Sequence, residues 1–237
     1  MSLFFSRRSL ALERMDTETL DPATAAHVFR NLETINRWLG GVRATLWHFT
    51  RFSKVWKAGE RIRILDWGTG GADMPRALVR WARRRGYEFH VVGIDQDAVT
   101  TQCARRACRD YPEITIVHAD ARAFTADPGS FDYAISSLTL HHLSPEAIID
   151  VLRSSDRLAK RGIVMNDLRR SGRAWAWIWM MSRVFGWHSM VQHDGPLSVR
   201  RAFTRKELVV LAQDAGLSYL KVDAHFGHRL TLAGEKS

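Results

Sequence analysis

Between residues 61 and 167 the sequence alternates short apolar runs with longer stretches in which apolar residues recur at helical spacing. Short, fully apolar runs are typical of buried parallel strands, and the stretches between them predict helices on both faces of the sheet. We expect strands at 62–67, 89–95, 115–118, 131–136 and 162–167, and helices near 74–85, 98–109 and 145–158.

The pattern continues beyond residue 203. Thr204-Arg-Lys-Glu207 forms a capping box, which predicts the start of a helix that runs to about Ala215. Two strand-like runs follow, at 218–223 and 229–233. The expected fold is therefore α/β: a Rossmann-like, seven-stranded, mostly parallel sheet with helices on both faces and a hairpin-like ending.

The residues before the sheet predict a helical cap. Asp21 can cap a helix, Pro22 suits its first turn, and Gly40-Gly41 end a stretch with helical spacing. We expect this helix, from about 21 to 41, to lie over the carboxyl edge of the sheet. The predicted organisation is an N-terminal helical cap at 1–58 and a domain at 59–237 that carries an insertion at 168–203 after the fifth strand.

The insertion contains the run Ala174-Trp-Ala-Trp-Ile-Trp-Met-Met181, which is apolar on every face of a helix. The run is too short to cross a bilayer. It leaves three interpretations open: buried core, a lid over a substrate, or shallow contact with a membrane.

Composition limits the class of protein. In 237 residues with 46% hydrophobic content there are 2 cysteines, Cys103 and Cys108, which fall on different faces of a predicted helix. This disfavours a disulfide framework or a zinc-cysteine site and indicates a reducing compartment. The N-terminus lacks a secretory signal, so we expect a cytoplasmic protein.

The formal net charge is +10. Such a charge can attract RNA, anionic lipid or an acidic protein. The arginines occur as scattered short groups, such as Arg83-Arg84-Arg85 and Arg200-Arg201, which are more typical of a solvated surface than of one binding tail.

The strongest chemical motif lies at the end of the first predicted strand, in Leu65-Asp-Trp-Gly-Thr-Gly-Gly-Ala-Asp73. Glycines at a strand-to-helix turn let the backbone approach a ligand closely. Asp66 precedes the first glycine, and Asp73 occupies the place of the third glycine of a dinucleotide fingerprint. Both carboxylates would repel a pyrophosphate and favour a zwitterionic amino-acid group, whose ammonium needs an anion.

Acidic residues also end the next two strands. Asp95 follows Val91-Val92-Gly93-Ile94, where a carboxylate can accept both hydroxyls of an unphosphorylated ribose. Asp120 follows His118-Ala119, where it can accept from an exocyclic amine, and Ala121 offers a backbone amide.

These stretches, with the string from Phe131 to Leu143, resemble the ordered motifs of class I S-adenosylmethionine (SAM)-dependent methyltransferases over roughly 61–160. The chain looks closest to the branch resembling ubiquinone/menaquinone-biosynthesis enzymes. Residues 35–41 and 193–204 also resemble enzymes of polyketide or phenolic-lipid biosynthesis, a part of secondary metabolism.

The resemblance implies SAM as the cofactor. It implies that Asp66 and the Gly68–Ala72 loop hold the methionyl group, Asp95 the ribose, and Asp120 with Ala121 the adenine. The expected cofactor site comprises Asp66, Gly68, Thr69, Gly70, Ala72, Asp95, Gln96, Asp120, Ala121 and Ser137.

Methyl transfer from a sulfonium requires alignment and exclusion of water, and we expect no metal. A base near the carboxyl ends of strands four and five would assist an acceptor that loses a proton, and the candidates are His141, His193 and Asp167. The candidate acceptor contacts, in or beside the apolar insertion and strand ends, are His142, Asn166, Arg170, Trp175, Trp179 and Arg200.

The expected function is thus transfer of a methyl group to oxygen or carbon of a small, apolar or aromatic acceptor such as a quinone, phenolic lipid or polyketide. Peripheral contact with a membrane stays open, and the sequence does not indicate an oligomeric state. An RNA methyltransferase is the main competing interpretation because of the net charge. Ser136-Ser-Leu-Thr139 lacks the Asn-Pro-Pro-aromatic string of many amine-modifying nucleic-acid enzymes, so a nucleic-acid partner is disfavoured.

The glycine motif also bears on two further classes of protein. A nicotinamide-dependent reductase is disfavoured by Asp66 and the absent third glycine. A non-catalytic SAM-binding protein stays open, because a fold does not by itself establish an activity.

Overall fold

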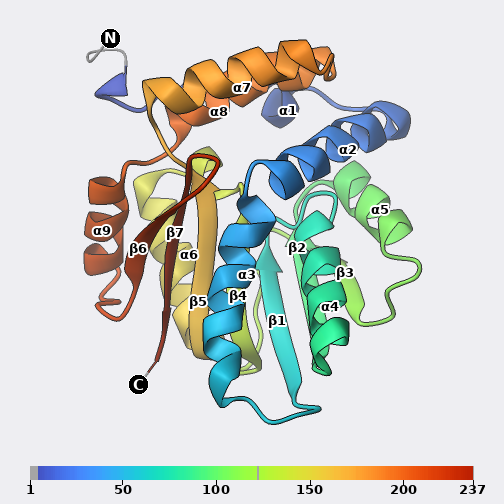
Figure 1. The fold of residues 1–237 in the computed structure, drawn as a ribbon, viewed down its shortest axis with the longest axis vertical. Coiled ribbons are helices and arrows are strands. Elements are labelled where there is room, and N and C mark those ends of the chain that lie inside the picture. Colours follow the sequence, from blue (N-terminus) through green and yellow to red (C-terminus); the bar gives the residue numbers. More distant parts are fainter. Residues whose placement is uncertain (1–4, 122, 237) are drawn as a thin grey trace.

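The structure is a computed structural model that describes residues 5–121 and 123–236. A seven-stranded sheet with the order β3-β2-β1-β4-β5-β7-β6 forms its centre (Figure 1). Strand β7 is antiparallel to both of its neighbours, and the remaining pairs are parallel. The strands are β1 (Arg61–Trp67), β2 (Glu88–Asp95), β3 (Ile114–His118), β4 (Phe131–Ser137), β5 (Ala159–Leu168), β6 (Lys221–His225) and β7 (Arg229–Glu235). The predicted Rossmann-like sheet is confirmed.

One strand lies later in the chain than the sequence predicts. The apolar run at 218–223 predicts a strand, but β6 begins at Lys221. Leu217 and Leu220 are buried in the hydrophobic core, where they pack as parts of the turn after the preceding helix. The apolar run at the start of this range therefore reflects side chains that pack in the core and not a strand of the sheet.

Helices cover both faces of the sheet. On one face α3 (Gly41–Phe52) and α4 (Asp73–Arg85) pack on an aromatic core that includes Phe49, Trp81 and Tyr133. On the other face α6 (Pro145–Leu158) and α9 (Arg205–Asp214) bury leucine and isoleucine side chains (Figure 1). Helix α5 (Ala98–Ala107) packs beside β3 on the same face as α4, where Tyr111 and Ile114 contact the buried side chains of both helices. The predicted capping box is present at the start of α9, where Thr204 and Glu207 bond reciprocally.

The expected helix at 21–41 is present as α2, and a second helix, α3, follows it that the sequence pattern did not predict. Helix α2 (Pro22–Trp38) begins at the predicted cap, Asp21, whose side chain accepts from two backbone N–H groups. The chain then turns at Gly40 with φ of 82°, and α3 begins at Gly41. A β-carbon on Gly40 would lie 2.3 Å from the carbonyl oxygen of Phe226, so this close turn requires glycine.

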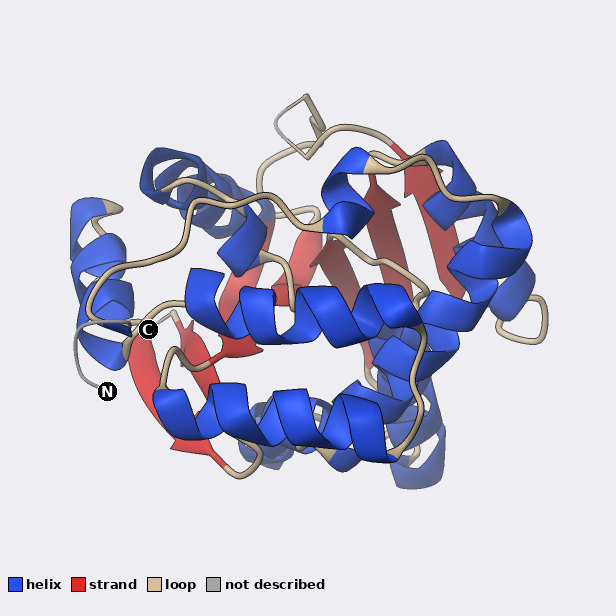
Figure 2. Cartoon of the chain, turned by 90° about the horizontal axis from the view of Figure 1, so that it is seen from above, coloured by secondary structure: helices blue, strands red, loops and turns tan. Residues whose placement is uncertain are grey.

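Four helices lie above the carboxyl ends of the parallel strands: α1 (Arg14–Thr17), α2, α7 (Gly172–Val184) and α8 (Ser189–Arg201) (Figures 1 and 2). The last two form the predicted insertion and pack on each other. Helix α7 buries Ala174, Ile178 and Ser182, while Trp177 and Trp179 on its other faces are about 40% exposed. None of the described helices combines the length and apolar character that crossing a membrane requires.

Candidate active site

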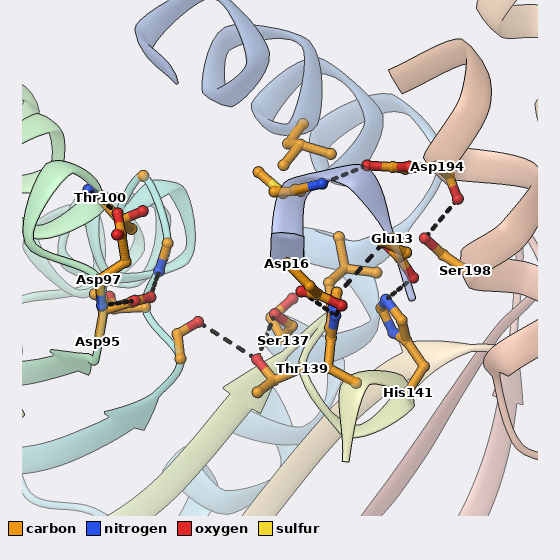
Figure 3. A pocket seen from close by; sticks show the side chains of 18 of the residues that line it. Glu13, Asp16, Asp95, Asp97, Thr100, Ser137, Thr139, His141, Asp194 and Ser198 are labelled. Carbon is orange, nitrogen blue, oxygen red and sulfur yellow. Dashed lines mark hydrogen bonds and ion pairs between the residues drawn. The ribbon is translucent and has the colours of Figure 1, made fainter. Parts of the chain in front are cut away.

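A cavity of about 860 Å³ lies at the carboxyl ends of β1, β2 and β4, beneath α1, α2 and α8. Its two ends differ in character. The glycine loop after β1 and residues 95–97 after β2 line one end, and residues 12–20, 138–143 and part of α8 line the other. Figure 3 shows Asp95 and Asp97 at the first end and Glu13 and His141 at the second, with Ser137 and Thr139 between them.

The glycine loop has a shape that other residues would not adopt. Gly68 and Gly70 have φ of 64° and 53°. A β-carbon on Gly68 would lie 2.6 Å from the Thr139 hydroxyl, and one on Gly71 would lie 2.9 Å from Phe29. The backbone of the loop therefore lines the cavity without side chains, and it is packed between Thr139 on one side and Phe29 of α2 on the other.

The side chain of Asp66 lies behind this loop, fully buried. One carboxylate oxygen accepts from the Thr69 hydroxyl at 2.8 Å, whereas the other has no hydrogen-bond partner within residues 5–121 and 123–236. Burial raises the pKa of Asp66 to about 8, and the nearby Asp73 and Asp95 carboxyls act in the same direction. A cation beside this buried carboxyl would stabilise its ionised form.

Asp95 joins the loop to the end of β2. Its carboxylate accepts from the backbone N–H of Gly70 at 3.0 Å and from that of Asp97 at 3.1 Å. Burial raises the pKa of Asp95 as well. Each oxygen keeps a lone pair for a further donor in the cavity.

At the other end of the cavity His141 is oriented by Asp167. Residues Leu140–His142 form the 3-10 turn η3 after β4, and Asp167 lies near the end of β5. The Asp167 carboxylate accepts from the backbone N–H of His141 at 2.8 Å and lies 2.7 Å from its Nδ1 atom. His141, through its charge and hydrogen bonds, holds the pKa of the buried Asp167 carboxyl below its usual range although burial acts against this. The pair leaves Nε2 of His141 directed away from Asp167.

The N-terminal segment completes this end of the cavity. Glu13 is 3% exposed and lies against both histidines, and Asp16 lies 2.9 Å from Nδ1 of His142. Burial raises the pKa of Glu13 to about 7, against the opposing effects of His142 and the Ser198 hydroxyl. Arg201 donates to the backbone carbonyls of His141, His142 and Ala11, so it fixes the turn after β4 to the N-terminal segment.

The structure brings most of the expected cofactor residues to the cavity. Asp66 and Ala72 lie behind the loop, and the others line the cavity wall: Gly68, Thr69, Gly70, Asp95, Gln96, Asp120, Ala121 and Ser137. His141 and His142 also line it, and Asp167 lies directly behind His141.

Six other expected residues do not line the cavity. Trp175, Trp179 and Arg200 belong to α7 and α8 but lie outside the lining. The His193 ring lies 2.7 Å from the Asp194 carboxylate, but its side chain is 53% exposed and outside the cavity. Asp194 uses its carboxylate to accept from the backbone N–H groups that begin α1.

Arg170 and Asn166 make hydrogen bonds and an ion pair within the protein. The buried Arg170 guanidinium donates to the carbonyls of Phe5 and Ala202 and pairs with Glu207 at 2.6 Å. The side-chain amide of Asn166 donates to the carbonyl of Gly41 and the hydroxyl of Thr45. The bonds of Asn166 hold α3 to β5. Those of Arg170 hold the start of the insertion to its end at Ala202 and to the N-terminal segment.

Sequence reasoning missed Glu13, Asp16, Arg201 and Asn36, all of which line the cavity. Glu13 and Asp16 lie in a segment without periodic pattern, so nothing local predicted their place. Asn36 donates to Asp73 at 2.9 Å and to Ser137 at 3.3 Å, and its position on the buried face of the predicted helix was the one available signal.

Known proteins that resemble the chain in sequence or in fold are methyltransferases. Residues 64–162 match a family described as a methyltransferase domain. This segment contains the glycine loop, Asp95, Asp120 and His141. No curated protein sequence matches the chain.

Solved structures agree over nearly the whole chain. The plantazolicin methyltransferase BpumL in complex with SAH has a TM-score of 0.67 at 13% identity, with 91% of this chain and 90% of that chain covered. A putative SAM-dependent methyltransferase from Methanococcus maripaludis has 0.64 at 14%, covering 97% and 98%. A SAM-dependent methyltransferase from Aquifex aeolicus has 0.61 at 16%, covering 92% and 99%. The chain has the Rossmann-like fold of these methyltransferases.

Proposed function

We propose that the protein is a SAM-dependent methyltransferase that transfers a methyl group to oxygen or carbon of a small, largely apolar acceptor. One observation carries this proposal: a single cavity joins an acidic, glycine-lined end at β1 and β2 to an end that holds an oriented histidine. The match of residues 64–162 to a methyltransferase domain supports it.

The acidic end fits the charge of the proposed cofactor. SAM supplies a methyl group on a positively charged sulfur and carries an ammonium group. The buried Asp66, with one unpartnered oxygen, suits that ammonium, and the free lone pairs of Asp95 suit the ribose hydroxyls. Three carboxyls here, on Asp66, Asp73 and Asp95, would repel a pyrophosphate.

The other end fits an acceptor with an apolar body and one polar atom. The apolar lining at this end comes from Leu12, Leu138, Ile178 of α7, and Met190 and Val191 of α8. His141 supplies the polar group, and its pairing with Asp167 fixes the ring. We propose that these residues align the acceptor, exclude water and place its reacting atom toward Thr139 and the glycine loop.

We further propose that the acceptor belongs to the phenolic, quinone-like or polyketide-like compounds. The resemblance of residues 35–41 and 193–204 to enzymes of such pathways supports this, as does the apolar lining. The decisive test is incubation with labelled SAM and lipid extracts of the producing cell, followed by mass identification of the labelled product. Binding of SAM by the folded protein without turnover of any extract would instead support a non-catalytic SAM-binding role, and no binding of SAM or SAH would end the proposal.

The raised pKa of Asp66 makes binding of SAH depend on pH. Below pH 8 the Asp66 carboxyl of the free protein holds a proton, and an ammonium ligand favours the ionised form. Affinity should therefore rise with pH, by up to about tenfold between pH 6 and pH 7. For the same reason the free protein should lose stability as pH rises from about 4 to about 8, because the folded state retains a proton that the unfolded state has released.

Calorimetric titration with SAH at several pH values measures this dependence. The variant Asp66→Asn should bind more weakly and show a flat profile over this range, because its amide does not titrate. A wild-type affinity that stays constant between pH 6 and pH 7 would show that Asp66 does not face the ammonium.

We also propose that α7 contacts an anionic membrane surface, from which an apolar acceptor would enter. Helix α7 exposes Trp177, Trp179 and Met180, and Val184 and the following Phe185 are more than 60% exposed. The exposed Arg183 lies 4.3 Å over the Trp179 ring, so a cation accompanies the apolar face. An apolar helical face with basic side chains is typical of interfacial helices.

The double variant Trp179→Ser/Phe185→Ser should bind vesicles of phosphatidylserine and phosphatidylcholine at least about tenfold more weakly, since each lost aromatic side chain removes about 1.5 kcal/mol or more of burial energy. Co-sedimentation measures the partition. Val209→Ser, an exposed change on α9, should leave it unchanged. Equal vesicle binding by the double variant and wild type would refute the membrane contact.

A further inference from the structure

Two imidazoles and one carboxylate converge at the acceptor end of the cavity. Nε2 of His141 lies 3.7 Å from one oxygen of Glu13, and Nε2 of His142 lies 3.9 Å from the other. The ligand-capable atoms of these three residues all lie within 4.8 Å of one another. Figure 3 shows Glu13 and His141 facing each other across this space.

A carboxylate behind each ring determines how the two histidines face Glu13. Asp167 lies 2.7 Å from Nδ1 of His141, and Asp16 lies 3.0 Å from Nδ1 of His142. An Nδ1 that donates to a carboxylate leaves the lone pair on Nε2 free. This is the arrangement in which histidines bind metal ions, with an outer carboxylate that fixes the tautomer and makes the ring more basic.

The Glu13 carboxylate is buried and only partly hydrogen-bonded. It is 3% exposed, and its oxygen nearest His141 has no hydrogen-bond partner in the described residues. The gaps between Glu13 and the two histidines are too long for hydrogen bonds. Two lone pairs and a buried carboxylate that face one another are costly unless a cation or a proton lies between them, and Arg201 comes no closer to this oxygen than 3.6 Å.

We propose that His141, His142 and Glu13 bind one divalent transition-metal ion of the zinc class. Ligands about 2.1 Å from a tetrahedral zinc ion lie about 3.4 Å apart. The gaps of 3.7 Å and 3.9 Å from Glu13 to the two histidines need to shorten by a few tenths of an ångström, and any pair nearer the 4.8 Å limit by more. Two imidazoles and one carboxylate suit zinc or iron(II) and not magnesium or calcium. This site differs from the expectation, drawn from the sequence, that no metal is bound.

The surrounding charges accommodate a cation. The carboxylate of Glu13 faces the site, and those of Asp16 and Asp167 lie behind the two rings. Arg201 lies 3.6 Å from Glu13 and 3.5 Å from Asp16, and its hydrogen bonds go to backbone carbonyls. Arg8 likewise donates to the carbonyl of His141. Both guanidiniums are thus anchored to backbone carbonyls beside the site.

Three protein ligands leave a position of the ion open toward the cavity, as in catalytic zinc sites. If the proposed methyltransferase function holds, this position binds the oxygen of the acceptor and favours its ionised form. His141 then acts as a ligand and not as the general base expected from the sequence. The metal site itself does not depend on the proposed function, because it can be measured without SAM.

The test uses the full chain, stripped of metal by a chelator and titrated with Zn²⁺ alone in competition with a chromogenic chelator. Wild type should bind one equivalent, and Mg²⁺ in excess should not displace it. Glu13→Gln should abolish stoichiometric binding while circular dichroism shows a folded chain. Asp16→Asn should weaken it about 10- to 100-fold, as for other outer carboxylates. His90→Ala, a change at an exposed histidine on β2, should bind like wild type.

A second variant keeps the proposal testable if Glu13→Gln does not fold. His142 is more exposed than His141, so His142→Ala should fold and should also lose the equivalent. X-ray absorption of the zinc-loaded wild type should show two imidazoles in the first shell. Absence of stoichiometric binding by wild type, or equal binding by wild type and His142→Ala, would overturn the proposal and leave a proton as the charge between these groups.

Discussion

Asp95→Ala is expected to weaken the binding of SAM and SAH by about 100-fold or more. The alanine removes a carboxylate that we place on both ribose hydroxyls, and hydrogen bonds to a charged group contribute about 1.5–3 kcal/mol each. It also releases the backbone N–H of Gly70, so the glycine loop loses its tie to β2. Isothermal titration calorimetry measures the loss directly.

Asp110→Ala provides the matched control, because Asp110 is exposed and lies outside the cavity lining. It should bind SAH like wild type. If Asp95→Ala and Asp110→Ala bind equally well while both remain folded, the nucleoside does not lie at the end of β2 and the assignment of this end of the cavity is wrong.

Asp167→Asn is expected to lower the rate of methyl transfer by about 10²–10⁴ while the affinity for SAH stays within a few-fold of wild type. The buried Asp167 carboxylate fixes both the backbone and the ring of His141. An amide of the same shape cannot accept from both, so Nε2 loses its lone pair or its direction. A single-turnover assay with saturating SAM separates this loss from any change in binding.

The outcome also bears on the role of His141. A general base and a metal ligand both need Nε2 aimed into the cavity, so Asp167→Asn and His141→Gln should lose similar amounts of activity in either case. Added chelator distinguishes them, because it lowers the wild-type rate only if a metal is bound. Asp150→Asn, on the exposed face of α6, should keep full activity, and a full rate in Asp167→Asn would remove the His141–Asp167 pair from the mechanism.

The sheet and the cofactor end could be predicted from the sequence because their determinants are close together in the chain. Asp66, the glycines and Asp73 occupy one strand, one turn and the start of one helix. The carboxyl ends of parallel strands meet at one edge, so the order of the strands also brings Asp95 and His141 to that edge.

The roof over the acceptor could not be predicted in this way. Whether Trp179 faces the cavity or solvent depends on how α7 packs against α8, and Ala174 and Ile178 decide that packing. The sequence indicates Arg170 as a candidate contact of the acceptor, but its hydrogen-bond acceptors include Phe5, 165 positions earlier in the chain. Such long-range partners leave no local pattern in a sequence.

Glu13 illustrates the same limit for the candidate site. Its segment has neither strand nor helix periodicity, and it is placed by bonds from Arg14 and Met15 to Asp194, 180 and 179 positions away. A carboxylate that ends up 3% exposed was therefore indistinguishable in the sequence from an ordinary surface glutamate.

The separation between the N-terminal segment and its partners has a consequence for biosynthesis. Ribosomes release the residues around Glu13 early, but Arg201 and Asp194, which secure that segment, are made much later. Contacts of such high sequence separation form late in folding. The end of the cavity that Glu13 encloses can therefore form only after residue 201 has been synthesised.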